Sequence, residues 1–294
     1  MLLTSATHAA STIAASAETL PAWKAVILGL VEGITEFLPI SSTGHLLVAE
    51  RLLDLGTTTV AKDAIDAYTV IVQLGAILAV LVVSWRRVLD VLNGLIGRSE
   101  KGRKLLINLV VSFVPAAIIG FVGKKLIEEK LLKPIPVAIA WAVGAAVILL
   151  MVGRYRRAVT TGTGMDALTP RNAAIIGFAQ TLAMWPGVSR SLVTILAAVL
   201  IGMKLRDAVE YSFLLGLLTL GAASVYSIAK DGSLVGDTYG WSSPILGMVV
   251  AFASALIAVK WMVAYLNNRD LTIFAWYRFA VAAACIALVV AGTI

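Results

Sequence analysis

Cysteine, histidine and charged side chains are scarce in this chain of 294 residues. The single cysteine, Cys285, excludes an intramolecular disulfide, and it lies in an apolar run where no redox centre is expected. With only two histidines the chain has no Cys/His metal cluster, so a bound metal would be a hard cation held by carboxylate and phosphate oxygens. Charged residues make up 14% of the chain, well below the share that soluble domains carry.

Apolar residues make up 60% of the sequence and gather in long continuous runs. Their lengths are close to the ~20 residues that a helix needs to cross a bilayer, and they do not alternate as barrel strands do. The sequence therefore predicts an all-α polytopic membrane protein. The net charge of +7 indicates basic cytoplasmic loops rather than a nucleic-acid partner. Residues 1–22 lack a basic start and are expected to form a loose tail rather than a signal peptide.

Two polar-interrupted segments divide the rest of the chain into halves. The first half, residues 23–153, begins with the interrupted segment from Trp23 to about Leu53, and the second, residues 171–294, begins with that from Asn172 to Met203. Three continuous apolar runs follow in each half: Ala64–Trp85, Leu105–Val122 and Ile135–Val152, then Val209–Ala229, Pro244–Leu266 and Ile273–Ile294.

The two halves resemble each other residue by residue, which indicates an internal repeat. The aligned pairs include Gly29 with Gly177, Ser41 with Ser189, Gly75 with Gly216, and Phe113 with Phe252. If each interrupted segment dips into the membrane and returns, three crossings remain per half, and the second half is inverted. We therefore expect a single membrane domain built as an inverted-topology repeat, with six transmembrane helices and two re-entrant helical hairpins.

Basic residues collect on one side of this six-span arrangement. The loops at residues 86–104 and 154–171 carry most of them, together with Lys204, Arg206, Lys260 and Arg269. The positive-inside rule makes this side cytoplasmic and places both termini outside. The first interrupted segment would then enter from the outer face and the second from the inner face.

The stretch from Glu32 to His45 is unusually polar for a membrane segment. Glu32 and Glu36 are four residues apart, so they share one face of a helix that Pro39 is expected to end. Ser42 follows where a new helix begins, and His45 lies one turn further along the same face. Polar groups at membrane depth are costly, so a functional role is expected for them.

A second polar motif lies in the second interrupted segment. Pro186 and Gly187 break the chain, Ser189 and Ser191 can cap the helix that follows, and Arg190 is a permanent cation. Two half-helix N-termini, one from each repeat, would face each other near mid-membrane. Together with the arginine they predict a site for an anion such as phosphate.

The acids of the first motif would repel a bare phosphate, so we expect a divalent cation, Mg²⁺ or Ca²⁺, on Glu32 and Glu36. Acids, hydroxyls, a histidine and an arginine around one anion favour phosphoryl chemistry. Two mechanisms stay open. Ser42 attacks phosphorus, with Glu36 or His45 as the base, or His45 attacks while Ser42 is a ligand.

The two motifs resemble the signature motifs of the undecaprenyl-diphosphate phosphatases of the bacitracin-resistance family. The resemblance covers nearly the whole chain after about residue 22. It implies an enzyme of the bacterial plasma (inner) membrane, with its active site opening to the periplasmic or outer face. This enzyme would remove the terminal phosphate of the C55 lipid carrier and so recycle the carrier for cell-wall synthesis. Bacitracin would act indirectly, by sequestering this substrate. The family's functional residues fall on Glu32, Glu36, Ser42, His45 and Arg190.

Two positions depart from the family pattern, because Leu192 stands where a glycine is usual and Leu218 where a proline is usual. Further contacts with the polyprenyl diphosphate substrate are expected from Ser41, Thr43, Ser189, Ser191, Thr194 and Arg278. The alternative function is a polyprenyl-phosphate flippase or transporter, because inverted repeats also serve alternating access. The sequence leaves open whether the chain forms a homodimer.

Overall fold

The computed structural model describes residues 20–294, apart from the side chains of residues 124–126 and 128. The tail expected over residues 1–22 lies outside the described residues except for its last three, of which Leu20 is buried. The named elements are all helices: α2 Ala22–Thr35, α3 Ser42–Leu52, α4 Thr59–Val83, α5 Trp85–Leu95, α6 Glu100–Leu131, α7 Pro134–Leu150, α8 Val152–Thr160, η1 Met165–Ala167, α9 Pro170–Gln180, η2 Thr181–Met184, α10 Arg190–Leu200, α11 Leu205–Tyr239, α12 Ser242–Leu266 and α13 Thr272–Val290.

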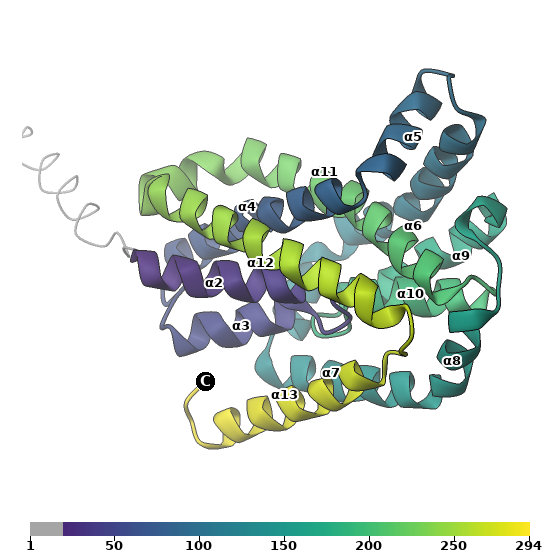
Figure 1. Ribbon diagram of the computed structural model, residues 1–294. Coiled ribbons are helices and arrows are strands. Elements are labelled where there is room, and N and C mark those ends of the chain that lie inside the picture. The colour runs from purple at the N-terminus through teal and green to yellow at the C-terminus, as the bar shows by residue number, and fades with distance from the viewer. Residues whose placement is uncertain (1–19) are drawn as a thin grey trace, which may run out of the picture.

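Long apolar helices confirm the prediction of an all-α polytopic membrane protein (Figure 1). In the described part of the chain, 5 helices are long and apolar enough to cross a membrane: α4, α6, α11, α12 and α13. The count rises to 6 when α7 and α8, which follow each other with a bend of 57°, are taken as one span. These spans coincide with the six continuous runs of the sequence.

The two interrupted segments form helical hairpins, α2–α3 and α9–η2–α10, whose helices are too short to cross a membrane alone. α2 has 14 residues, and α3, α9 and α10 have 11 each. At a rise of 1.5 Å per residue, 11 residues extend over roughly 16 Å, about half of the hydrocarbon core. The first helix ends at Thr35, ahead of Pro39. A proline disfavours the helical conformation in the residue before it, so helices usually end before a proline.

The basic segments expected as loops contain helices, which corrects the sequence-based assignment. Residues 86–104 include most of α5 and the start of α6, and residues 154–171 include most of α8. α5 and α6 pack closely at Gly94 and Gly102, where an added Cβ would collide with the backbone of the other helix. The outer face of α5 leaves Trp85, Leu92 and Leu95 exposed.

Ion pairs join the basic segments at one end of the molecule. Arg87 Nε donates to Glu210 Oε1 at 3.2 Å, and Arg156 Nε donates to Asp270 Oδ2 at 2.9 Å. Partial burial alone would raise the pKa of the Asp270 carboxyl, but hydrogen bonds from Thr272 and Arg156 outweigh it and hold the pKa below its usual value. The start of α2 and the C-terminus lie at the opposite end (Figure 1).

Helices of the two halves pack across each other in a reciprocal pattern. α2 packs on α12, with Gly29 against the Gly247 carbonyl, while α9 packs on α6, with Gly177 against the Ser112 backbone. α4 pairs with α11, and α7 pairs with α13. A two-fold axis relating the halves would place α2 on α9 and α12 on α6, and it would exchange α4 with α11 and α7 with α13. The division into two inverted repeats stays a prediction that this packing supports.

Candidate functional site

The bends of the two hairpins carry matching strained serines. Ser41 (φ 73°) and Ser189 (φ 78°) each precede a half-helix and adopt a left-handed backbone conformation that non-glycine residues rarely take. Such a conformation costs on the order of 1–3 kcal/mol and persists only where the surroundings fix it. These serines are two of the residues that the sequence alignment of the halves paired.

Hydrogen bonds between the hairpins supply part of that fixation. The Gly187 N–H donates to Ser41 Oγ at 3.2 Å, and Ser191 Oγ donates to the Leu38 carbonyl at 2.9 Å. Each bend thus contributes a serine hydroxyl that contacts the backbone of the other bend. The half-helices α3 and α10 are thereby held in a fixed relation.

Arg278 of α13 binds both bends at once. Its guanidinium is fully buried and donates to the carbonyls of Pro39 at 3.1 Å, Gly187 at 2.9 Å, Trp141 at 3.2 Å and Ala140 at 3.0 Å. A guanidinium has five N–H donors, and four of them donate to backbone carbonyls here. The sequence predicts that Arg278 contacts substrate, and that role stays a prediction. In the structure its hydrogen bonds go to backbone carbonyls and hold the two bends together.

Glu36 is the centre of the polar contacts. Its Oε2 accepts a short hydrogen bond from Ser42 Oγ, and Gln73 Nε2 lies 3.5 Å from the same oxygen. Its Oε1 pairs with Arg190 Nη2 at 2.9 Å. The first hairpin therefore supplies an acid and a hydroxyl, and the second hairpin supplies the cation that contacts the acid.

Arg190 is held from three sides. Besides Glu36, its guanidinium donates to the Ser212 carbonyl at 2.9 Å and lies over the ring of Phe37, 5.1 Å from the centroid. Its Nε has no hydrogen-bond partner. Gly216 of α11 makes room for the guanidinium, because any Cβ at that position would collide with it.

His45 lies apart from the serine. Its Nδ1 is 2.7 Å from the Ser41 carbonyl and its Nε2 is 2.9 Å from the Tyr277 hydroxyl. Because a carbonyl only accepts, Nδ1 carries the proton and Nε2 accepts from the tyrosine. The ring also packs against Trp141 and Tyr277. Both nitrogens are thus occupied by groups other than Ser42, although the spacing predicted that these two residues act together.

Glu32 is the unpaired acid of the site. Its side chain is 1% exposed, and neither carboxylate oxygen has a hydrogen-bond partner in the part of the chain that the structure describes. The described residues contain no group of three or more His, Cys, Asp or Glu side chains that would hold a metal ion alone. The two buried carboxylate oxygens of Glu32 are donors of the kind that a hard cation binds, and phosphate oxygens and water would have to supply its other ligands.

A cavity of about 160 Å³ opens beside these groups. At its deep end lie Glu32, Ser42 and Gln73, and at its mouth lie Lys62 and Asp66 in the first turns of α4. The remaining lining residues are Thr43, Leu46, Leu47, Glu50, Thr69, Val70 and Leu132. The cavity therefore joins the hydroxyl–acid pair to the end of α4 that lies away from the basic helices.

Most residues predicted to contact substrate make hydrogen bonds to other groups of the protein. Only Thr43 of that set lines the cavity. Ser189 Oγ accepts from the Leu192 N–H at 3.3 Å, so it caps α10, and Thr194 Oγ1 donates to the Arg190 carbonyl at 2.8 Å. Leu192, where the family glycine was expected, is buried in the first turn of that helix.

The cavity is also lined by Lys62, Asp66 and Thr69 of α4, which are not among the predicted site residues. Lys62, Asp66, Thr69 and Gln73 follow one another at spacings of four, three and four residues, which places them on one helix face. This polar stripe was the signal that the sequence offered. The continuous apolar run expected over Ala64–Trp85 contains three of these four residues, so the prediction treated them as part of a membrane span.

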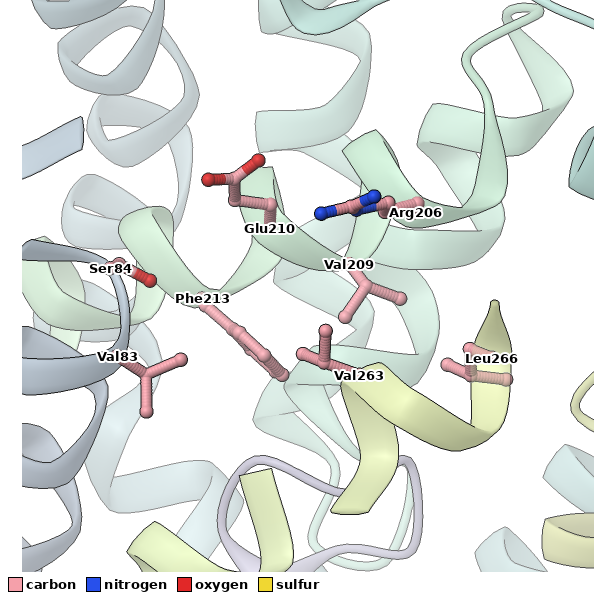
Figure 2. Close-up of a pocket in the computed structure, with 8 residues that line it drawn as sticks. All are labelled: Val83, Ser84, Arg206, Val209, Glu210, Phe213, Val263 and Leu266. Carbon is pink, nitrogen blue, oxygen red and sulfur yellow. The ribbon is translucent and has the colours of Figure 1, made fainter. Parts of the chain in front are cut away.

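A second cavity, of about 140 Å³, lies between α4, α11 and α12 toward the basic end (Figure 2). Arg206 and Glu210 stand at one rim, and the Phe213 ring lies beneath them. Phe213 packs edge-on against Phe37, with ring centroids 5.5 Å apart. Two aromatic rings therefore separate this cavity from the Glu36–Arg190 pair, and its acid is already paired with Arg87.

The fold and these contacts define an integral membrane protein with a buried centre of hydroxyl, carboxylate and guanidinium groups. Comparison with known proteins names the family. The family described as bacitracin resistance protein BacA matches residues 25–284, and the chain belongs to it. It is 44% identical over 258 residues to undecaprenyl-diphosphatase 2 of Rhodospirillum rubrum, covering 87% of this chain and 91% of that relative. It is 41% identical over 260 residues, with the same coverage, to undecaprenyl-diphosphatase of Burkholderia mallei strain SAVP1.

Proposed function

We propose that this protein is a membrane phosphatase that hydrolyses undecaprenyl diphosphate to undecaprenyl phosphate and inorganic phosphate, as the names of its relatives suggest. The carrying observation is Glu36, which contacts the Ser42 hydroxyl with one oxygen and Arg190 with the other. A hydroxyl beside a base and a cation is the arrangement that nucleophilic attack on a phosphoryl group needs. The lipid product re-enters cell-wall synthesis.

In the proposed mechanism Ser42 Oγ attacks the terminal phosphorus and transfers its proton to Glu36. The new Oγ–P bond replaces the bond to the bridging oxygen, whose electrons leave with undecaprenyl phosphate. Arg190 neutralises charge on the transferring oxygens. Glu36 then gives this proton to the leaving undecaprenyl phosphate and becomes a carboxylate again. Water attacks the phosphoserine phosphorus with Glu36 as base, the P–Oγ bond breaks, and Oγ takes the proton back from Glu36 as inorganic phosphate leaves.

Ser42 is the better nucleophile of the two candidates. Its hydroxyl already donates to a carboxylate and lines the cavity, whereas both nitrogens of His45 are engaged with Ser41 and Tyr277. We assign His45 to positioning: its Nδ1–H holds the carbonyl of the strained residue directly before Ser42. The His45-nucleophile mechanism would require both of these contacts to break first.

A divalent cation, Mg²⁺ or Ca²⁺, would bind at Glu32, whose buried carboxylate accepts no hydrogen bond from the described residues. When bound it would supply Lewis-acid stabilisation of phosphate charge. The proposal uses Glu36 differently from the sequence-based expectation, because its oxygens are already occupied by Ser42 and Arg190. Glu36 is assigned as the base, and Glu32 as the cation ligand.

The cavity mouth supports an outward-facing site in a bacterial plasma membrane. α4 has 25 residues, about 37 Å of helix, with Lys62 in its first turn and Arg86 and Arg87 just beyond its last. If the basic end is cytoplasmic, the mouth opens to the periplasmic or outer face. Bacitracin would then act by sequestering the lipid diphosphate. All proposed reacting groups come from one chain, so the reaction does not depend on a homodimer.

Phosphate release from undecaprenyl diphosphate by purified protein in detergent tests the function, because no gradient exists there. Release with Mg²⁺ or Ca²⁺ is expected, and none at all would favour the flippase alternative. Substrate labelled in its terminal phosphate should leave labelled phosphate on the wild-type protein. His45→Asn should carry the same label, and Ser42→Ala should carry none. Label retained by Ser42→Ala would refute the assigned nucleophile.

A further inference from the structure

Among the described side chains that line the cavity containing Ser42, Lys62 is the one lysine or arginine. It lies on α4, and its ammonium pairs with Asp66 Oδ1 at 2.5 Å. The pair is half-exposed at the mouth, with side-chain exposures of 40% and 49%. The other charged lining residues are acids: Glu32, Glu50 and Asp66.

The charges of the cavity pose a problem for the proposed substrate. Undecaprenyl diphosphate carries two phosphates, and Arg190 can serve only the terminal one that Ser42 attacks. The lipid-side phosphate must lie further out, along a wall that contains the acids Glu50 and Asp66. Without a cation at that depth, these acids would repel it.

The position of Lys62 meets this need. Because its ammonium contacts Asp66, it lies near the height of residue 66, seven residues before Gln73. Seven residues of helix correspond to roughly 10 Å. Gln73 contacts the same carboxylate oxygen as Ser42, so it marks the depth of the reacting group. A diphosphate extending outward from Ser42 covers most of this distance, and the flexible lysine stem covers the remainder.

The apolar part of the lining shows where the lipid chain would leave. Leu46 and Leu47 of α3 and Leu132, at the end of α6, border the cavity beside this mouth. A headgroup held between Ser42 and Lys62 would place the first isoprene units against these leucines. The phosphate next to the chain would then face the lysine.

We propose that Lys62 forms a subsite for the lipid-side phosphate, releasing Asp66 when the substrate binds. This subsite rests on the proposed function and deepens it. The enzyme would recognise a polyprenyl diphosphate through two cations at two depths, Arg190 for the phosphate that leaves and Lys62 for the one that stays on the lipid. The monophosphate product would keep its contact with Lys62, whereas inorganic phosphate would not use it.

Two inhibitors of phosphate release separate this role from general structure. Undecaprenyl phosphate carries the lipid-side phosphate, and inorganic phosphate occupies only the terminal position. Lys62→Gln should raise KM for undecaprenyl diphosphate and the inhibition constant of undecaprenyl phosphate about five- to tenfold, as expected for a charge-assisted contact near solvent. The inhibition constant of inorganic phosphate and kcat should stay within twofold of wild type.

Lys62→Arg should restore the wild-type KM for undecaprenyl diphosphate and the wild-type inhibition constant of undecaprenyl phosphate. Asp66→Asn should raise neither constant, because it frees the lysine. Lys130→Gln, an exposed lysine in the last turn of α6 that does not line the cavity, is the matched control. If undecaprenyl phosphate inhibited wild type and Lys62→Gln with the same inhibition constant, the subsite would be overturned while the phosphatase function stood. A parallel rise for both inhibitors would also overturn it, since that indicates a distorted site. A wild type that releases no phosphate would overturn the function and the subsite together.

Discussion

Replacing Arg278 by methionine should destabilise the protein without a selective effect on substrate binding. The change removes four hydrogen bonds to backbone carbonyls on α7 and on the two bends. Hydrogen bonds to a charged group contribute about 1.5–3 kcal/mol each, so their sum is about 6–12 kcal/mol. Burying a guanidinium costs several kcal/mol, which leaves a net loss of roughly 3–5 kcal/mol.

The assay is the half-life of phosphate release when purified protein is warmed in detergent. A loss of 3 kcal/mol that appears wholly in the unfolding rate shortens the half-life by about 100-fold. Arg278→Lys should lie in between, since an ammonium has three donors for four carbonyls. Arg98→Met, at an exposed arginine, is the control. If Arg278→Met kept the wild-type half-life and only raised KM, the residue would be a substrate ligand after all.

Three further changes test the site and its surroundings. Glu36→Gln keeps the shape but not the base, and kcat should fall by roughly 10²–10⁴-fold in the phosphate-release assay. Gly216→Ala places a methyl group against the Arg190 guanidinium and should lower kcat by at least about tenfold, whereas Gly221→Ala, which enters open space, should not. Because the pKa of Asp270 is lowered in the folded protein, its contribution to stability is present above the ordinary pKa and is lost as pH falls through the folded value. Thermal half-life should therefore drop between about pH 5 and pH 3 more in wild type than in Asp270→Asn.

The hairpins and the spans could be predicted because their signals are local. Apolar runs of sufficient length mark the crossings, and a proline followed by serines marks the first break. The sequence predicts a loop where α5 forms, because arginines follow Trp85, although Trp85, Leu89 and Leu92 recur at helical spacing. An interfacial helix can carry both patterns on different faces.

The partners of the motif residues could not be predicted, because they depend on tertiary contacts. Nothing in the sequence near Arg278 distinguishes an arginine that binds phosphate from one that binds carbonyls. The difference arises because Pro39 and Gly187, far apart in the chain, leave their carbonyls unpaired on the same side. Likewise His45 has the right spacing to reach Ser42 on an ideal helix, but Tyr277 of α13 occupies its outer nitrogen.

The division of the site between two hairpins also explains why the bends are tied so firmly. Glu36 and Arg190 are charges at membrane depth, and each would be costly if the other were withdrawn. In the proposed mechanism this ion pair prepares Ser42 for attack, and in the structure it is also a contact that joins the two hairpins. A substrate phosphate that draws on Arg190 weakens this contact during the reaction. The uncharged ties through Ser41, Ser191 and Arg278's carbonyl contacts do not involve the phosphate, so they can keep the bends in place while the charges rearrange.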